Sequence, residues 1–199
     1  MLRVLEDIVP ALPHSTVLDV GCGTGVLGLY VALHRRRTTA VLLDCDRGAM
    51  RSARANVRAN LLALRRQRST AHVVRADVLS AIRAKGGPLT VVANLPFDHR
   101  AAPTKGPDPL GGQARAFRDT AYRAHRRLIL AVAERSGARL ILAASETIGD
   151  LGAIEAMIGA ATLEIMGQVT FWFRTPRRGA PDAVNAYTVF DVRSTRTAV

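Results

Sequence analysis

The chain has 199 residues, 48% of them hydrophobic and 22% charged, a composition typical of one globular domain and not of a disordered or fibrous chain. We expect no membrane partner and no leader, because no apolar run approaches a membrane span and no secretory signal opens the chain. The net charge of +12 indicates either a polyanionic partner such as RNA or a surface biased toward arginine. Cys22 and Cys45 form neither a disulfide framework nor a metal cluster, which favours a cytoplasmic protein without a metal.

The first predicted element is an amphipathic helix, followed by a linker and the first strand. Apolar residues recur at helical spacing before Pro10, and Pro10 and Pro13 end the helix. The polar residues after Val192 read as a tail. We therefore expect an N-terminal helix and linker over 1–15, one main domain over 16–193 and a tail over 194–199.

A glycine turn follows the first strand, which is predicted over residues 16–20. Asp19 lies near the end of this strand, and Gly21, Gly23 and Gly25 follow at alternate positions before a helical pattern. Glycine permits a positive φ and lets a ligand lie against bare main chain. The helix that follows offers unpaired N–H groups and the positive end of its dipole. This order predicts a nucleotide-type cofactor site.

Two cofactors compete for the glycine turn. Residues 23–28 fit the G-x-G-x-x-G pattern of dinucleotide sites, so an NAD-dependent oxidoreductase is one alternative. Residues 19–25 place an acid beside the turn, where it would repel a pyrophosphate but suit a cationic amino-acid group. This stretch resembles motif I, D/E-x-G-x-G-x-G, of the class I S-adenosylmethionine-dependent methyltransferases. The resemblance implies that Asp19 faces the amino-acid portion of S-adenosylmethionine, with Cys22 and the turn glycines around it.

The second strand, predicted over 39–43, runs into a second acidic position. Asp44 lies about 20 residues beyond the turn, where an acid accepts hydrogen bonds from the ribose hydroxyls of NAD or S-adenosylmethionine. Cys45 belongs to the same site, whereas Asp46 is placed to cap a helix predicted over 47–64. One side of this helix carries arginines and the other is apolar, which is typical of a solvated face. The two sides are Arg47, Arg51, Arg54 and Arg58, and Ala53, Val57, Leu61 and Leu64.

A third strand, predicted over 72–76, ends at Asp77. Because the carboxyl ends of parallel strands meet at one sheet edge, we expect this acid to accept a hydrogen bond from the adenine amino group. The Val78 N–H would then meet a ring nitrogen. The alternative is that Asp77 only caps a short helix over 78–84.

The fourth strand, predicted over 89–93, runs into Asn94, Leu95, Pro96 and Phe97. This tetrapeptide resembles the N-P-P-Y/F motif of methyltransferases that modify planar nitrogens, with leucine in place of the first proline. Asn-Leu-Pro-Tyr occurs in the rRNA adenine dimethyltransferase family, and the sequence through His99 also looks like the N-P-P-F-H of small-subunit rRNA guanine methyltransferases.

The motif has a clear chemical demand. The lone pair of an amide or aniline-like nitrogen is delocalised, so two acceptors on its N–H groups would favour rehybridisation and aim the lone pair at the methyl group. The resemblance implies that the Asn94 side-chain oxygen and a backbone carbonyl are these acceptors, and that Phe97 stacks on the acceptor. The alternative is a strand-ending turn without chemistry.

The remaining pattern continues to alternate helices and strands after a long Pro- and Gly-rich loop over 98–114. We expect this loop to cover the acceptor, with His99 either a general base or simply exposed. The helix after the loop is predicted to turn five residues inward, namely Phe117, Tyr122, Leu128, Leu130 and Val132. The later elements are helices over 115–136 and about 150–159 and strands over 138–144, 161–173 and 184–192.

Alternating strands and helices closed by a hairpin predict a doubly wound α/β sheet. The resemblance covers nearly the whole chain and implies a seven-stranded Rossmann-like methyltransferase sheet of order 3-2-1-4-5-7-6 with the last strand antiparallel. It also implies methyl transfer from S-adenosylmethionine to a planar nitrogen, with S-adenosylhomocysteine as product. Since little chain is left for a recognition domain, we expect a small-molecule or peptidic acceptor. An rRNA or tRNA base is the alternative, and a non-catalytic RNA-binding relative is a third hypothesis.

Overall fold

The computed structural model describes residues 2–13, 15–78, 89–95, 122–145, 150–175 and 183–196. Its helices are α1 (Leu2–Ile8), the 3-10 helix η1 (Val9–Ala11), α2 (Val26–His34), α3 (Arg47–Ala59), α4 (Leu61–Arg66), α6 (Arg123–Ala133) and α7 (Leu151–Ala160). Its strands are β1 (Thr16–Val20), β2 (Thr39–Asp44), β3 (Thr70–Arg75), β4 (Thr90–Ala93), β5 (Arg139–Ser145), β6 (Leu163–Thr175) and β7 (Ala183–Ser194).

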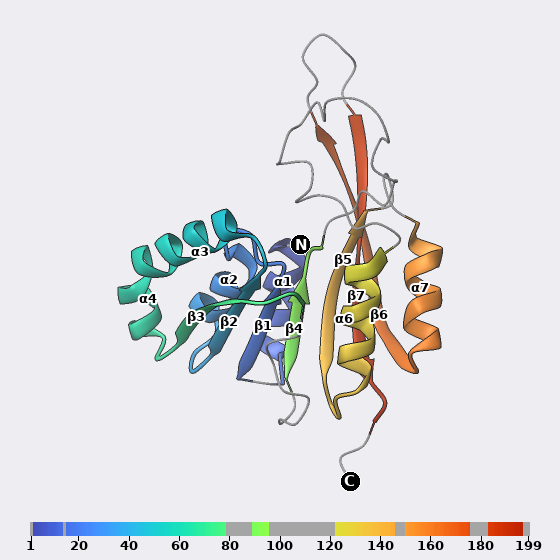
Figure 1. The fold of residues 1–199 in the computed structure, drawn as a ribbon, viewed down its shortest axis with the longest axis horizontal. Coiled ribbons are helices and arrows are strands. Elements are labelled where there is room, and N and C mark those ends of the chain that lie inside the picture. Colours follow the sequence, from blue (N-terminus) through green and yellow to red (C-terminus); the bar gives the residue numbers. More distant parts are fainter. Residues whose placement is uncertain are drawn as a thin grey trace.

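The strands form one seven-stranded sheet of order β3-β2-β1-β4-β5-β7-β6 (Figure 1). Strands β1 to β5 run parallel, whereas β7 runs antiparallel to both β5 and β6. Strand β4 is buried along its whole length and β1 along nearly all of it, because helices cover both faces of a parallel sheet. The predicted fold class, strand order and antiparallel last strand are confirmed.

Helices cover the two faces of the sheet as separate layers. On one face α1 and α2 contribute Leu5 and Val31, which pack with Val17 of β1. Ala53 of α3 joins Leu42 of β2 in a neighbouring cluster. Burial of these apolar side chains is the main term that stabilises the layered arrangement.

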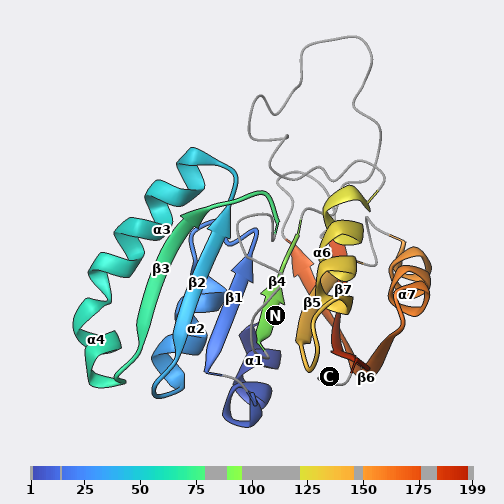
Figure 2. The ribbon, with the colours of Figure 1, turned by 60° about the horizontal axis from the view of Figure 1, so that its bottom comes forward.

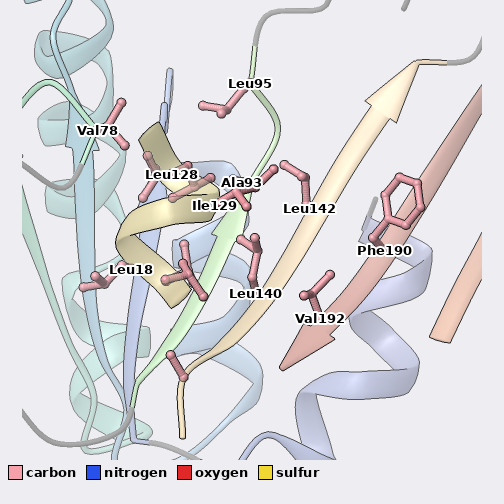
Figure 3. Close-up of a cluster of buried hydrophobic side chains, with 14 of the residues drawn as sticks. Leu18, Val78, Ala93, Leu95, Leu128, Ile129, Leu140, Leu142, Phe190 and Val192 are labelled. Atoms are coloured by element: carbon pink, nitrogen blue, oxygen red, sulfur yellow. The ribbon is translucent and has the colours of Figure 1, made fainter. Parts of the chain in front are cut away.

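On the other face, α6 and α7 cover the central and antiparallel strands. Leu128 of α6 and Ile158 of α7 are buried against Leu140 of β5 and Phe190 of β7. Leu18 of β1 belongs to the same cluster, so the core reaches from the first strand to the hairpin (Figure 3). The side chains of successive strand residues point to alternate faces, which is why β1 serves both layers.

The carboxyl ends of the parallel strands meet at one edge of the sheet. The arrowheads of β1, β2, β3 and β4 point the same way in Figure 2, and α3 begins at that edge. Ligands of doubly wound sheets bind outside this edge. The fold therefore directs the acids and the amide at the strand ends to one place.

Three predictions about the helices are wrong. The helix predicted over 47–64 is divided at Asn60, whose N–H contacts the carbonyls of both Asn56 and Val57 before α4 begins. Leu61 is 44% exposed instead of buried. On α6, Leu130 is 48% exposed although the periodicity turned it inward.

Several predicted segments fall outside the described residues. They are the start of the helix over 115–136, the loop over 98–114 with His99, the helix over 78–84 beyond Val78, and the hairpin turn. The domain bounds and the cytoplasmic location stay predictions. No helix in the described ranges is long and apolar enough to cross a membrane.

Candidate functional site

The acids and the amide singled out in the sequence lie at the carboxyl edge of the sheet. Val20 of β1 pairs with Leu43 of β2 and Ala93 of β4. Asp44 and Asn94 each follow directly after the residue that pairs with Val20. They therefore lie on the two sides of β1, just past its carboxyl end. Strand β3 ends beside Asp44, which brings the start of the Asp77 segment to the same edge.

The glycine turn lies between β1 and α2 and uses the backbone freedom of its glycines. Gly21, Gly23 and Gly25 have φ values of 68°, 54° and 81°, a region that other residues rarely adopt. The turn is tied down by the Cys22 N–H, which donates to the Leu43 carbonyl at 2.9 Å. Gly25 is the N-cap of α2, so bare main chain and a helix N-terminus face the same edge.

Asp19 is buried beneath this turn, with 1% of its surface exposed. Its Oδ2 accepts a hydrogen bond from the Gly28 N–H at 2.8 Å. Its Oδ1 is buried and has no hydrogen-bond partner among the described residues. Burial raises the pKa of this carboxyl to about 7, against the lowering effect of the Gly28 hydrogen bond and with a smaller rise from Asp44.

The residue that follows Gly21 does not supply a nucleophile. Burial, together with the negative charge of Asp19 and Asp44, raises the pKa of the Cys22 thiol to about 12. A thiol with that pKa is protonated near neutral pH, and the thiolate is the reactive form. Cys22 therefore serves the site as a small buried side chain.

Gly28 must lack a side chain for Asp19 to reach it. A Cβ on Gly28 would overlap Leu42 Cδ2 and lie 2.9 Å from Asp19 Cβ. We expect Gly28→Ala to lower the free energy of unfolding by about 1–3 kcal/mol, because the packed interior cannot make room without strain. Urea denaturation checks this value.

Gly159 of α7 is the matched control for that substitution. A Cβ there would meet no heavy atom within 4 Å. We expect Gly159→Ala to leave stability unchanged or raise it by up to about 1 kcal/mol, since alanine is the better helix former. Equal losses in both variants would contradict the close contact assigned to Gly28.

Both carboxylate oxygens of Asp44 accept backbone hydrogen bonds, and one of them holds the glycine turn to β2. Oδ2 accepts from the Gly23 N–H and Oδ1 from the Asp46 N–H, each at 2.8 Å. Asp46 caps α3 by accepting from the Ala49 N–H at 2.7 Å, as predicted. Cys45 lies beside them at the surface. The pKa of its thiol is raised, mainly because the sulfur is partly shielded from water and secondarily because of the nearby carboxylates.

One side chain that supports the turn was not assigned a role from the sequence. The Asn56 amide on α3 donates to the Thr24 carbonyl at 2.9 Å, so α3 and the glycine turn are connected directly. The two residues are 32 positions apart. The signal for it in the sequence is weak: Asn56 lies on the helix that follows Asp44, the acid predicted to bind the ribose.

Asp77 is exposed and forms an ion pair with Arg127 of α6. Sequence reasoning missed Arg127, because nothing in its helical pattern marks a partner 50 residues away. Val78 is buried in the core cluster shown in Figure 3. Its φ of 56° lies in the left-handed region, and the helix that the cap alternative requires lies beyond Val78, outside the described residues, so both interpretations of Asp77 stay predictions.

Two residues of the Asn-Leu-Pro-Phe stretch are described, an exposed asparagine and a buried leucine. Asn94 is exposed at the end of β4, whereas Leu95 is 3% exposed. Leu95 Cδ2 lies 3.0 Å from where a Cβ on Gly21 would be. Leu95 therefore holds the segment against the glycine turn, while Pro96 and Phe97 lie outside the described residues.

The site contains acceptors, bare main chain and a helix N-terminus, which are groups that bind and orient ligands. Within the described ranges, no group of three or more His, Cys, Asp or Glu side chains is placed to hold a metal ion. The buried Asp19 Oδ1 is an acceptor that lacks a donor, which fits a cationic ligand group. This arrangement suits binding and alignment of two reactants.

Part of the chain is similar in sequence to known methyltransferases. The chain is 38% identical over 94 residues to a protein of Pseudomonas syringae pv. tomato named ribosomal RNA small subunit methyltransferase C. It is 37% identical over 98 residues to ribosomal protein L11 methyltransferase of Thermoanaerobacter pseudethanolicus. These matches cover 47% and 49% of this chain but 25% and 28% of the relatives, so the chain spans about a quarter of their length.

A solved structure supports the fold over nearly the whole chain. It is a Streptococcus pneumoniae protein named for tRNA (m1A22) methylation and solved with S-adenosyl-L-methionine. The TM-score is 0.60 at 15% identity, over 99% of this chain and 74% of that one, a likeness that shows the shared fold. The family model of the methyltransferase small domain matches residues 2–106, more than half of the chain. The chain therefore belongs to the methyltransferase small domain family, within the class I methyltransferases.

Proposed function

We propose that the protein transfers a methyl group from S-adenosylmethionine to a planar nitrogen of an RNA base. The observation that carries the cofactor assignment is the buried, unpartnered Oδ1 of Asp19 beneath a turn of bare main chain. A cationic amino-acid group would meet this oxygen. A pyrophosphate would meet an excess of negative charge there. NAD is for this reason the weaker alternative.

The ribose and adenine of the cofactor would contact other residues at the carboxyl edge of the sheet. Asp44 would accept hydrogen bonds from the ribose hydroxyls, and Asp77 with the Val78 N–H would meet the adenine. Both acids are at least partly exposed, which a ligand contact requires. Cys22, Cys45 and the turn glycines would line the pocket around these groups.

When bound, S-adenosylmethionine would supply a methyl group on a sulfonium centre, ready for in-line displacement. The exposed Asn94 amide oxygen would accept a hydrogen bond from the acceptor nitrogen and direct its lone pair. A carbonyl of the segment after Asn94 would accept the second hydrogen, and Phe97 would stack on the acceptor base. As the N–C bond forms and the bond from sulfur to methyl breaks, S-adenosylhomocysteine would leave, and the nitrogen would return to neutrality by releasing one proton to solvent. Catalysis would then come from alignment and from hydrogen bonds that strengthen as the nitrogen becomes positive.

RNA is a better supported acceptor than the small molecule expected from the sequence. Relatives of this chain carry names of ribosomal RNA methyltransferases of both subunits. The net charge of +12 also favours a polyanion. A peptidic nitrogen is the second candidate, because another relative is named for ribosomal protein L11.

The deciding experiment is transfer of a labelled methyl group from S-adenosylmethionine into separated RNA, protein and metabolite fractions of a bacterial extract. We expect label in RNA that is destroyed by ribonuclease, and nucleoside analysis should find it on a base nitrogen. Label only in protein would favour the peptidic candidate. Label only in metabolites would contradict both, and absence of cofactor binding would contradict the enzyme assignment itself.

A further inference from the structure

We propose that four arginines of α3, here named the α3 arginine row, form a track for the phosphate backbone of RNA. The row comprises Arg47, Arg51, Arg54 and Arg58. The inference rests on the proposed function, because it assumes that the acceptor is RNA. It adds a second binding surface away from the reacting atoms.

The four side chains share one stripe of the helix. Their spacing of four, three and four residues places them within an arc of about 60° at 3.6 residues per turn. All four are exposed, whereas Met50 and Ala53 on the adjoining face are buried. None of the hydrogen bonds or ion pairs among the described residues involves the four guanidinium groups.

No acidic residue compensates for the charge of the row within its own stretch of sequence. From Arg47 to Arg75 the chain has eight arginines and neither aspartate nor glutamate. A solvated helix face normally mixes the two signs, and like charges four residues apart destabilise a helix. Arg47 and Arg51, like Arg54 and Arg58, repel each other in the free protein. A bound polyanion would relieve this repulsion.

The row is connected to the cofactor edge by its own helix. α3 starts immediately after Asp46 at the carboxyl edge of the sheet (Figure 2), and Asn56 of the same helix holds the glycine turn. From Arg47 to Arg58 the row extends for about 16 Å, enough to reach several phosphates. RNA bound along it is thereby held at a constant position relative to Asn94.

The chemistry of the row favours RNA over an anionic membrane. Guanidinium groups match phosphate oxygens in a bidentate geometry. A helix that lies on a membrane must also present an apolar face to the lipid. Met50 of α3 is buried and Ala53 packs with Leu42 of the sheet, so the exposed side of α3 presents arginines and no large apolar side chain.

The test compares two double variants of equal charge change. Arg51→Gln with Arg54→Gln disrupts the row, and Arg123→Gln with Arg126→Gln removes two exposed arginines of α6 on the other face of the sheet. The probe is a short fluorescent single-stranded RNA, titrated by anisotropy at several salt concentrations.

We expect the row variant to bind this RNA about 20-fold more weakly near 0.1 M salt. The slope of log affinity against log salt should fall by about 1.4, or about 0.7 for each phosphate that is no longer neutralised. The α6 variant should change the affinity much less. The affinity for S-adenosylmethionine and the unfolding temperature should not fall in either variant, which separates a weakened RNA surface from misfolding.

Three outcomes would overturn the inference. They are unchanged RNA affinity in the row variant, an equal loss in the α6 variant, or an equal dependence on the row for binding to phosphatidylglycerol vesicles. The proposed function fails separately. If the row variant loses RNA binding while the wild type methylates no RNA, the track stands without that function. If both methylate and bind RNA equally, the function stands without the track.

Discussion

Replacement of Asn94 by alanine is expected to lower kcat by about 100- to 1,000-fold while leaving the affinity for S-adenosylmethionine nearly unchanged. The amide is exposed at the end of β4, beside the glycine turn, and no hydrogen bond among the described residues uses its side chain. Its loss should therefore cost little stability. The rate that should fall is that of methyl transfer itself. Only in that step does the acceptor nitrogen lose conjugation and its N–H form a strong hydrogen bond to the Asn94 amide oxygen.

Single-turnover methyl transfer and calorimetric titration of the cofactor measure the two quantities separately. Asn60→Ala is the matched control, because it removes the same amide group at the junction of α3 and α4, away from the carboxyl edge. Its turnover should equal that of the wild type. If the Asn94 variant retains turnover, the acceptor nitrogen is oriented by other groups and the assignment of Asn94 is wrong.

Replacement of Asp19 by asparagine is expected to change the pH dependence of stability and to weaken cofactor binding. Burial raises the pKa of Asp19 to about 7, compared with about 3.9 in an unfolded chain. Between these values the folded protein holds a proton that the unfolded chain has released. The contribution of Asp19 to stability is therefore complete below about pH 4 and is lost as the pH rises through about 7.

The substitution removes this titration. Between about pH 5 and about pH 8, we expect the free energy of unfolding of the variant to gain about 2–3 kcal/mol relative to the wild type. Comparing the two proteins cancels the histidines and other groups that they share. Urea denaturation at several pH values measures the difference. Parallel pH profiles would show that Asp19 does not titrate in this range.

The same Asp19→Asn variant tests the cofactor assignment. The introduced amide retains an acceptor for the Gly28 N–H but places an N–H donor where the unpartnered oxygen of Asp19 lies. We expect the affinity for S-adenosylmethionine to fall at least about tenfold, since the attraction between opposite charges is removed. Asp46→Asn is the control: it changes a carboxylate that caps α3, and it should leave the affinity for S-adenosylmethionine unchanged. Unchanged affinity in the Asp19 variant would place the amino-acid portion elsewhere.

Much of the architecture was predictable from local patterns and from the resemblance that they support. The alternation of apolar strands and amphipathic helices reflects backbone geometry and side-chain spacing, which act over a few residues. The positive φ of the turn glycines and the capping of α3 by Asp46 are local for the same reason. The strand order depended on the resemblance, because pairing between distant strands leaves no mark within a single strand.

The predictions that proved wrong depended on periodicity without knowledge of neighbours. Leu61 and Leu130 fit the apolar stripes of their helices, but the division at Asn60 and the placement of α6 leave both side chains partly exposed. Hydrophobic side chains on the surface are common, since polar residues alone cannot cover a protein. Spacing alone therefore did not distinguish the two leucines from core residues.

The sequence by itself determined the elements, the glycine turn and the residue types at the strand ends. Only the tertiary structure decided that Asp19 is buried with one partnered oxygen, that Arg127 pairs with Asp77, and that Leu95 packs against Gly21. The reason is physical. Backbone preferences and caps are local, whereas desolvation and ion pairing depend on which distant segments the packed sheet brings within a few ångströms of each other.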